Sequence, residues 1–234
     1  MSTSLSHFSI IIILFFQIIT STVTSPQDPS DLPEVMAKIN GVPITREQFE
    51  RRLSQSRSMN PSKYDSMTGE EKERAVLRTL NAMIIRELEY QEALRNGIGV
   101  NDEEVEKEFQ DLRRRYTAEG EFSEALKEFH ITPEKWKEEM KRTMAIRKLE
   151  DKMARKIPIS ENEINEYLKI DKEKTTSVET GKEKKEKIRW IIQQNRWGEV
   201  RKAWLKGLAE NADIWRWSPS GKDLFPLPGV DVTN

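Results

Sequence analysis

The stretch that decides the fold is VMAKINGVPITREQFERRL, residues 35–53. Its Asn-Gly pair at 40–41 favours a two-residue hairpin turn, because both turn positions need positive φ. Pro43 cannot donate a backbone hydrogen bond, so the second strand belongs at a sheet edge. Thr45 and Gln48 then form a capping box, which predicts a helix directly after that strand. The stretch therefore predicts strand, tight turn, short strand and helix in quick succession.

Helical patterns fill most of the chain that follows. After a predicted loop over residues 57–69, a capping box of Thr68 and Glu71 opens a helix that runs to about Asn96. Gly97 is well suited to end that helix. Further helix starts are predicted at Asn101, Phe122, Thr132 and Ser160. The sequence therefore predicts a mainly α fold with a small N-terminal β-hairpin.

Composition excludes several classes of function. The 234 residues include no cysteine, which rules out disulfides, thiolate zinc sites and cysteine nucleophiles. The 39 basic and 40 acidic residues nearly cancel, whereas a general nucleic-acid binder carries a basic excess. His7 and His130 are the two histidines, too few for a histidine metal cluster, and His130 is interpreted as a loop or capping residue. The carboxylates are interpreted as helix-surface charges, so we expect no catalytic residues, no metal site and no cofactor.

The N-terminus has the pattern of an export signal. Residues 1–25 carry no charged side chain, and the apolar run from Phe8 to Thr20 is too short to span a bilayer comfortably. This predicts a signal peptide over 1–25, a polar linker over 26–33 and an exported, bacterial periplasmic protein with no stable membrane span after cleavage. An uncleaved N-terminal anchor is the alternative, because no Lys or Arg precedes the apolar run.

Two further segments follow the opening stretch in an informative order. They are LNAMIIRELEYQEALRNGIGVNDEEVEKEF (80–109) and ITPEKWKEEMKRTMAIRKLEDKMARKIPISENEINEYL (131–168). With residues 35–53, they resemble the N-terminal domain of the SurA, PrsA and PpiD group of exported folding factors. The resemblance implies a SurA N-terminal-domain-like helical chaperone domain over residues 34–170, closed by a C-terminal helix.

The chain departs from this group after residue 170. A parvulin-type prolyl isomerase domain usually follows the segment that matches ENEINEYL. Here only the polar stretch DKEKTTSVETGKEKKEK, residues 171–187, comes next, and it is too short to fold independently. We interpret it as a linker in place of the isomerase domain, followed by a C-terminal helix over 188–217 and an irregular tail over 218–234. The resemblance thus implies a chaperone module without isomerase activity.

Tryptophans mark the predicted C-terminal helix. Trp190, Trp197 and Trp204 recur every seven residues, so their indoles lie along one stripe of a helix. Trp197 and Trp204 share a sector with other apolar residues and are predicted to pack in the core. Trp190 and Ile191 belong to a turn that is apolar on several sides, which favours a binding surface instead.

A second aromatic pair follows the helix. Trp215 and Trp217 alternate as on an extended segment and would add an exposed aromatic edge. The predicted client-binding residues are therefore Trp190, Ile191, Trp215 and Trp217.

These patterns predict an exported, ATP-independent chaperone that binds unfolded or outer-membrane-bound polypeptides through an apolar and aromatic groove. Two alternatives stay open. One is a peptidyl-prolyl isomerase of the parvulin-associated group, which a proline-isomerisation assay would reveal. The other is an adaptor or assembly subunit of the same fold, for which a pull-down would return one stoichiometric partner.

Overall fold

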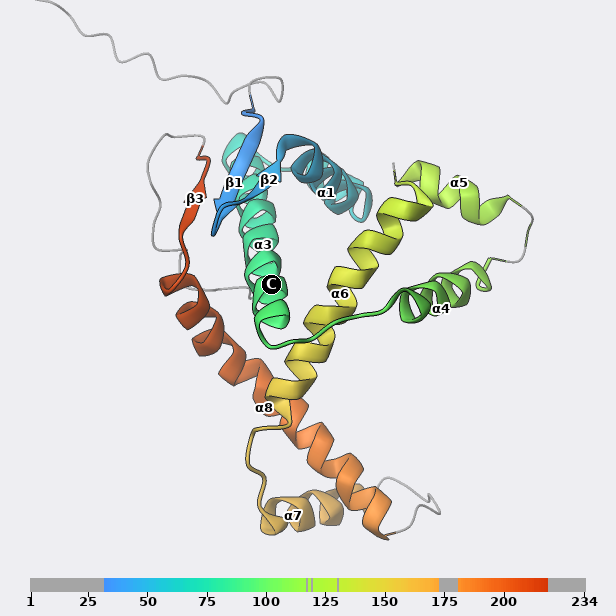
Figure 1. The fold of residues 1–234 in the computed structure, drawn as a ribbon, viewed down its shortest axis with the longest axis vertical. Helices are drawn as coiled ribbons and strands as arrows, with labels where there is room; N and C mark the ends of the chain where they lie inside the picture. The colour runs from blue at the N-terminus through green and yellow to red at the C-terminus, as the bar shows by residue number, and fades with distance from the viewer. Residues whose placement is uncertain (1–31, 117, 119, 130, 173–180, 219–234) are drawn as a thin grey trace, which may run out of the picture.

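The computed structural model describes residues 32–116, 118, 120–129, 131–172 and 181–218 (Figure 1). The predicted signal peptide, His130 and the tail after Ser218 lie outside these residues, as does most of the predicted linker over 26–33. The described residues form eight helices and three strands. This confirms a mainly α fold with a small N-terminal hairpin. The elements are β1 (Val35–Ile39), β2 (Val42–Thr45), α1 (Arg46–Ser58), α2 (Pro61–Asp65), α3 (Gly69–Arg95), α4 (Asp102–Arg113), α5 (Glu121–Glu128), α6 (Pro133–Ala154), α7 (Glu161–Lys172), α8 (Gly181–Glu210) and β3 (Ile214–Arg216).

Local sequence signals set the N-terminal elements. Asn40 and Gly41 both adopt positive φ, 49° and 86°, as the predicted turn between β1 and β2 requires. The sheet order is β2-β1-β3, so β2, which contains Pro43, lies at the edge as predicted. The predicted capping boxes at the starts of α1, α3 and α4 are all present. Side-chain chemistry at the helix ends therefore determines where these helices begin.

Three element boundaries differ from the sequence prediction. The predicted loop over 57–69 contains the short helix α2, because Pro61 is pre-organised for a first helical turn. Of the predicted linker over 171–187, residues 171–172 end α7 and residues 181–187 form the first turns of α8, since Lys and Glu side chains are good helix formers. Residues 173–180 lie outside the described residues. At its other end α8 stops at Glu210 and does not extend to residue 217. Residues 214–216 instead form β3, which pairs with β1.

The hydrophobic core has two parts. The first lies between the sheet, α1 and α3, and contains the fully buried Phe49 and Leu80. The second lies between the C-terminal half of α3, α4 and α6, around the fully buried Leu149. Helix α8 contributes Ala209 to the first part and packs Trp204 against the second. It therefore closes the domain by covering both parts of the core.

The segment after α8 returns to the N-terminal hairpin (Figure 1). The Trp217 backbone N–H donates to the Met36 carbonyl at 2.8 Å, and the Asn40 N–H donates to the Asp213 carbonyl at 2.7 Å. The Asn40 side chain accepts a further hydrogen bond from the Asp213 N–H, also at 2.8 Å. Residues far apart in the sequence thus meet along β1 and at the turn between β1 and β2.

Candidate functional site

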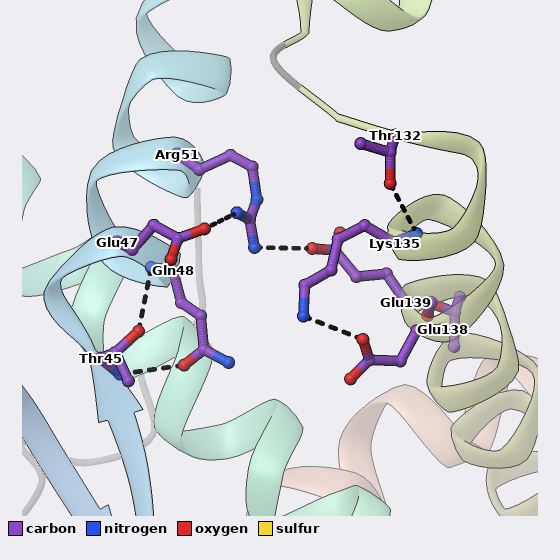
Figure 2. Close-up of polar contacts among 9 residues, drawn as sticks. Thr45, Glu47, Gln48, Arg51, Thr132, Lys135, Glu138 and Glu139 are labelled. Carbon is purple, nitrogen blue, oxygen red and sulfur yellow. Dashed lines mark hydrogen bonds and ion pairs between the residues drawn. The ribbon is translucent and has the colours of Figure 1, made fainter.

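A cleft opens between β2, α1, α3 and α6. Its volume is about 400 Å³. Figure 2 shows α1 and the first half of α6 facing each other across it, with α3 beneath. Apolar and charged side chains both line it. The apolar residues are Val42, Pro43, Ile44, Met83 and Ile146, and the charged ones are Arg51, Arg52, Arg86, Glu87, Lys135, Glu138, Glu139 and Arg142.

The α1 wall begins at the capping box after the edge strand. The Gln48 N–H donates to Thr45 Oγ1 at 3.3 Å, and the Thr45 N–H donates to Gln48 Oε1 at 2.9 Å (Figure 2). This cap fixes the start of α1, and Arg51 follows one turn later. Its guanidinium donates to Glu139 of α6 at 3.2 Å and to Glu47 at 3.1 Å. An ion pair therefore bridges the two walls of the cleft.

The α6 wall is held by local contacts near its N-terminus. Thr132 caps the helix, because its Oγ1 accepts a hydrogen bond from the Lys135 N–H at 3.2 Å (Figure 2). The Lys135 ammonium donates to Glu138 at 2.9 Å. This hydrogen bond is the main reason why the pKa of Glu138 lies below its usual value. Glu138 therefore keeps its negative charge at the rim of the cleft.

The base of the cleft contains a buried carboxylate on α3. Glu87 accepts hydrogen bonds from Arg142 of α6 and from Gln91 Nε2, the latter at 2.8 Å. The Arg142 guanidinium also lies 4.0 Å from the centre of the Tyr90 ring. Gln91 continues the network, because its Nε2 donates to the Ile39 carbonyl at 3.1 Å and its Oε1 accepts from Asn40. Glu87 was expected on the surface, but it is buried, and its contacts with Arg142 and Gln91 link α3 to α6 and to the hairpin.

Two arginines of the cleft have no ion-pair partner among the described residues. Neither Arg52 nor Arg86 has a carboxylate within 4.0 Å there, although Arg86 donates to Thr143 Oγ1 at 2.6 Å. Although Arg86 keeps an exposed surface, partial desolvation of its guanidinium in the cleft is the first cause that lowers its pKa. The positive charge of Arg52 is the second cause, and Arg142 contributes less. The cleft therefore carries more positive than negative charge.

The predicted client-binding residues lie elsewhere, at two separate places. Trp190, 45% exposed, lies with the half-buried Ile191 in the N-terminal half of α8, and its Nε1 donates to Asp151 at 3.3 Å. Trp215, 50% exposed, is in β3, and its neighbour Trp217 packs against the first part of the core. About 30 Å of helix separates Trp190 from the end of α8. None of these four residues lines the cleft, and their binding role stays a prediction.

The two other tryptophans of α8 belong to the core. Trp197 is buried, and Trp204 packs against the second part of the core. Their ring centroids lie 5.4 Å apart, within the range of favourable aromatic pairs. The prediction of core packing is confirmed for Trp197, and Trp204 is half-buried at the edge of the core.

Sequence reasoning missed the cleft residues for a simple reason. Val42, Met83 and Ile146 belong to apolar patterns that also describe ordinary core positions. One residue could have indicated an open apolar surface: Val42 is apolar and lies in a strand that Pro43 assigns to the sheet edge. An apolar side chain next to an edge proline is open on at least one side.

The described residues form a mainly helical domain with a small N-terminal hairpin, and the cleft lies between that hairpin and three of the helices. Residues 3–150 match the family described as SurA-like N-terminal domain, so the chain belongs to that family. No parvulin domain is detected. A search of curated proteins returns no match.

Two searches of the described residues gave negative results. No helix in this part of the chain combines the length and hydropathy needed to cross a membrane. Within the same residues, no three histidine or carboxylate side chains converge as metal ligands.

Ion pairs hold α7 against α8, at the far end of the molecule from the sheet (Figure 1). Glu161 pairs with Lys185 at 3.1 Å and with Arg189 at 2.6 Å, and Glu163 pairs with Arg196. The pKa of Glu163 falls to about 2, chiefly because it accepts a hydrogen bond from the Ser160 backbone N–H and secondly because of Arg196.

We expect α7 to detach from α8 in acid before the core unfolds. A carboxylate whose pKa is depressed in the folded state stabilises that state above its unfolded pKa of about 4.3. The contribution of Glu163 is therefore complete at pH 5 and is lost as the pH falls through about 2. Amide hydrogen-exchange protection factors for α7 and α3 at pH 5 and pH 2.5 measure this. Glu163→Gln should loosen α7 at pH 5, and equal loss of protection in both helices would contradict the expectation.

Proposed function

We propose that the protein is an exported, ATP-independent chaperone that binds unfolded polypeptide segments in the cleft between β2, α1, α3 and α6. The observation that carries the proposal is the cleft itself, in which apolar side chains lie between walls of charged residues. Membership of the SurA-like N-terminal domain family supports a chaperone role. Outer-membrane-bound polypeptides in the bacterial periplasm are the proposed clients, consistent with the predicted leader over residues 1–25.

The chemistry of the cleft suits binding that is broad in sequence. Burial of apolar client side chains contributes roughly 25 cal/mol per Å² without demanding one geometry. Met83 is unbranched and flexible, so it can adapt to different client side chains. The charged rim keeps the complex in solution, and the Arg51–Glu139 ion pair holds the walls at a fixed separation. Such a site binds many segments weakly, as a holdase requires.

Binding without catalysis is part of the proposal. Prolyl isomerisation in this group belongs to a parvulin domain between the elements that correspond to α7 and α8. In this chain only residues 173–180 separate the two helices, which is too few for a folded domain. The proposed role therefore needs no catalytic residue and no cofactor.

A second candidate surface is the aromatic one. Trp190 and Trp215 are among the large apolar side chains that the described residues leave exposed. Exposed aromatic residues beside polar ones suit weak contacts with unfolded chains. Trp190 lies in the N-terminal half of α8, and Trp215 lies in β3, beyond its C-terminal end. A long client could therefore contact both tryptophans and the cleft. The same surfaces would serve an adaptor with one dedicated partner.

Val42→Gln should reduce the suppression of client aggregation several-fold, since it places a polar amide against the apolar part of the cleft. Val200→Gln is the matched control, because Val200 is 43% exposed against 41% for Val42 but lies on α8 outside the cleft. Light scattering of an unfolded β-barrel client measures the effect, with thermal unfolding to check the fold.

The outcomes separate the two surfaces. Loss of suppression in Val42→Gln but not in Val200→Gln supports the cleft. Full suppression in Val42→Gln together with its loss in Trp190→Ala would move the binding site to α8. If neither change alters suppression, both proposed sites are wrong.

A further inference from the structure

The residues that line the cleft carry an excess of positive charge, and this excess comes from two arginines. Each carboxylate that lines the cleft already has a cationic partner from the same set. Glu87 pairs with Arg142, Glu138 with Lys135, and Glu139 with Arg51. Five cations and three anions line the cleft. The two cations left over are Arg52 on α1 and Arg86 on α3, whose side chains border the same space.

The positive charge of Arg52 disfavours the charged form of Arg86. The positive charge of Arg52 is the largest electrostatic contribution that lowers the pKa of Arg86, after burial. The two carboxylates that oppose this effect, Glu89 and Glu139, are themselves bound by Arg201 and Arg51. An anion between Arg52 and Arg86 would relieve this repulsion and satisfy guanidinium donors that have no carboxylate partner in the described residues.

Apolar residues surround this pair of cations. Met83 lies three residues before Arg86, on the same face of α3, and Ile146 and Val42 line the same space. Gln55, three residues after Arg52, lines it as well and offers an amide to a client backbone. A ligand that fills the cleft must therefore present a negative charge next to apolar groups.

We infer that the cleft selects extended polypeptide segments in which an aspartate or glutamate side chain lies beside apolar residues, with Arg52 and Arg86 binding the carboxylate. This inference rests on the proposed function, because it specifies which segments the cleft takes. It also adds selectivity to a site whose apolar part alone would discriminate poorly.

An internal acidic side chain fits better than a chain terminus. Terminal carboxylates are typically captured by clusters of free backbone N–H groups. The nearest candidates here are the edge strand β2 and the first turn of α1. Pro43 removes one N–H from β2, and the Gln48 N–H at the start of α1 already donates to Thr45. Long arginine side chains from two helices instead suit a carboxylate that reaches in from the side.

Three fluorescent peptides of the same apolar sequence test the inference on the full chain. The first has a central glutamate and an amidated C-terminus. The second carries glutamine in its place, and the third is the glutamine peptide with a free C-terminal carboxylate. We expect the glutamate peptide to bind about tenfold more tightly than the other two at low salt, as charge-assisted hydrogen bonds allow. The preference should shrink at 0.5 M salt.

Variants assign the preference to its residues. Arg52→Gln with Arg86→Gln should abolish the preference, so that the glutamate and glutamine peptides bind this variant with equal affinity. Arg78→Gln is the matched control, because Arg78 lies on α3 but outside the cleft. Thermal unfolding and circular dichroism show whether the double variant is folded, and measurable binding of the glutamine peptide shows that its cleft still takes a ligand.

Each remaining outcome overturns something definite. Equal binding of the glutamate and glutamine peptides overturns the inference and leaves the proposed function standing. Tight binding of the third peptide alone would assign the site to chain termini. If no peptide binds, the proposed cleft function fails together with the inference. If the control variant loses the preference as well, the preference for glutamate comes from the overall positive potential of the protein and not from Arg52 and Arg86.

Discussion

Arg201→Met is expected to lower the free energy of unfolding by about 3–5 kcal/mol near pH 8, because it leaves a buried charge unpaired. Arg201 on α8 forms ion pairs with Glu89 on α3 and with Glu150 on α6, the latter at 2.7 Å. Glu89 is only 2% exposed, so the loss of the guanidinium would leave its carboxylate without the charge that compensates its burial. The substitution would therefore remove the ion pairs that join α8 to both α3 and α6.

The pH dependence of this effect follows from the pKa of Glu89. Burial raises that pKa, and the charge of Arg201 opposes the rise. A carboxyl group with a raised pKa binds its proton more tightly in the folded state. The contribution of Glu89 to stability is therefore greatest at low pH and is lost as the pH rises through the raised pKa. Because removing Arg201 raises the pKa of Glu89 further, the deficit of Arg201→Met should be smaller at pH 5 than at pH 8.

Denaturant unfolding at both pH values measures this prediction. Lys202→Met is the control, since Lys202 is the exposed neighbour of Arg201 on α8 and should change stability by less than about 0.5 kcal/mol. Glu89→Leu combined with Arg201→Met should recover much of the loss, because well-packed apolar residues often replace a buried ion pair at little cost. A deficit below about 1 kcal/mol at pH 8 would show that Glu89 is solvated.

The buried ion pair marks a limit of sequence-based prediction. Capping boxes, the Asn40-Gly41 turn and the closing role of α8 depend on neighbouring residues or on a strong apolar stripe, and these predictions were correct. Glu89 gives no such signal, because it belongs to a helix rich in charged residues and looks like any surface glutamate. Its burial depends on α6 and α8 crossing α3 at that position. Helical periodicity does not determine where packed helices cross.

The candidate site is subject to the same limit. Val42, Met83 and Ile146 come from three elements, and the cleft exists because α3 and α6 diverge toward the sheet (Figure 1). The sequence instead drew attention to aromatic residues, because a seven-residue tryptophan repeat is visible without any tertiary information. That repeat correctly indicated a helix with a buried face, and the family resemblance implied that this helix closes the domain. It could not reveal which open surface of the folded domain is concave.

Trp197→Ala is expected to cost about 3–5 kcal/mol, the range for removing a large aromatic side chain from a core. Trp197 is only 6% exposed and packs its ring against Trp204. Truncation would remove that contact and leave a cavity between α8 and the rest of the domain. Because native stabilities are typically about 5–15 kcal/mol, this variant would be close to unfolding.

Trp190→Ala is the matched comparison within the same helix and should cost no more than about 1 kcal/mol. Its ring is nearly half exposed, and one hydrogen bond to Asp151 is its described polar contact. Denaturant midpoints of the two variants, analysed with a common slope, measure the difference. Equal losses would mean that the whole tryptophan stripe is a packing seam, which would remove Trp190 as a binding residue. A small loss would leave Trp190→Ala as a folded protein in which any change in aggregation suppression reports on binding alone.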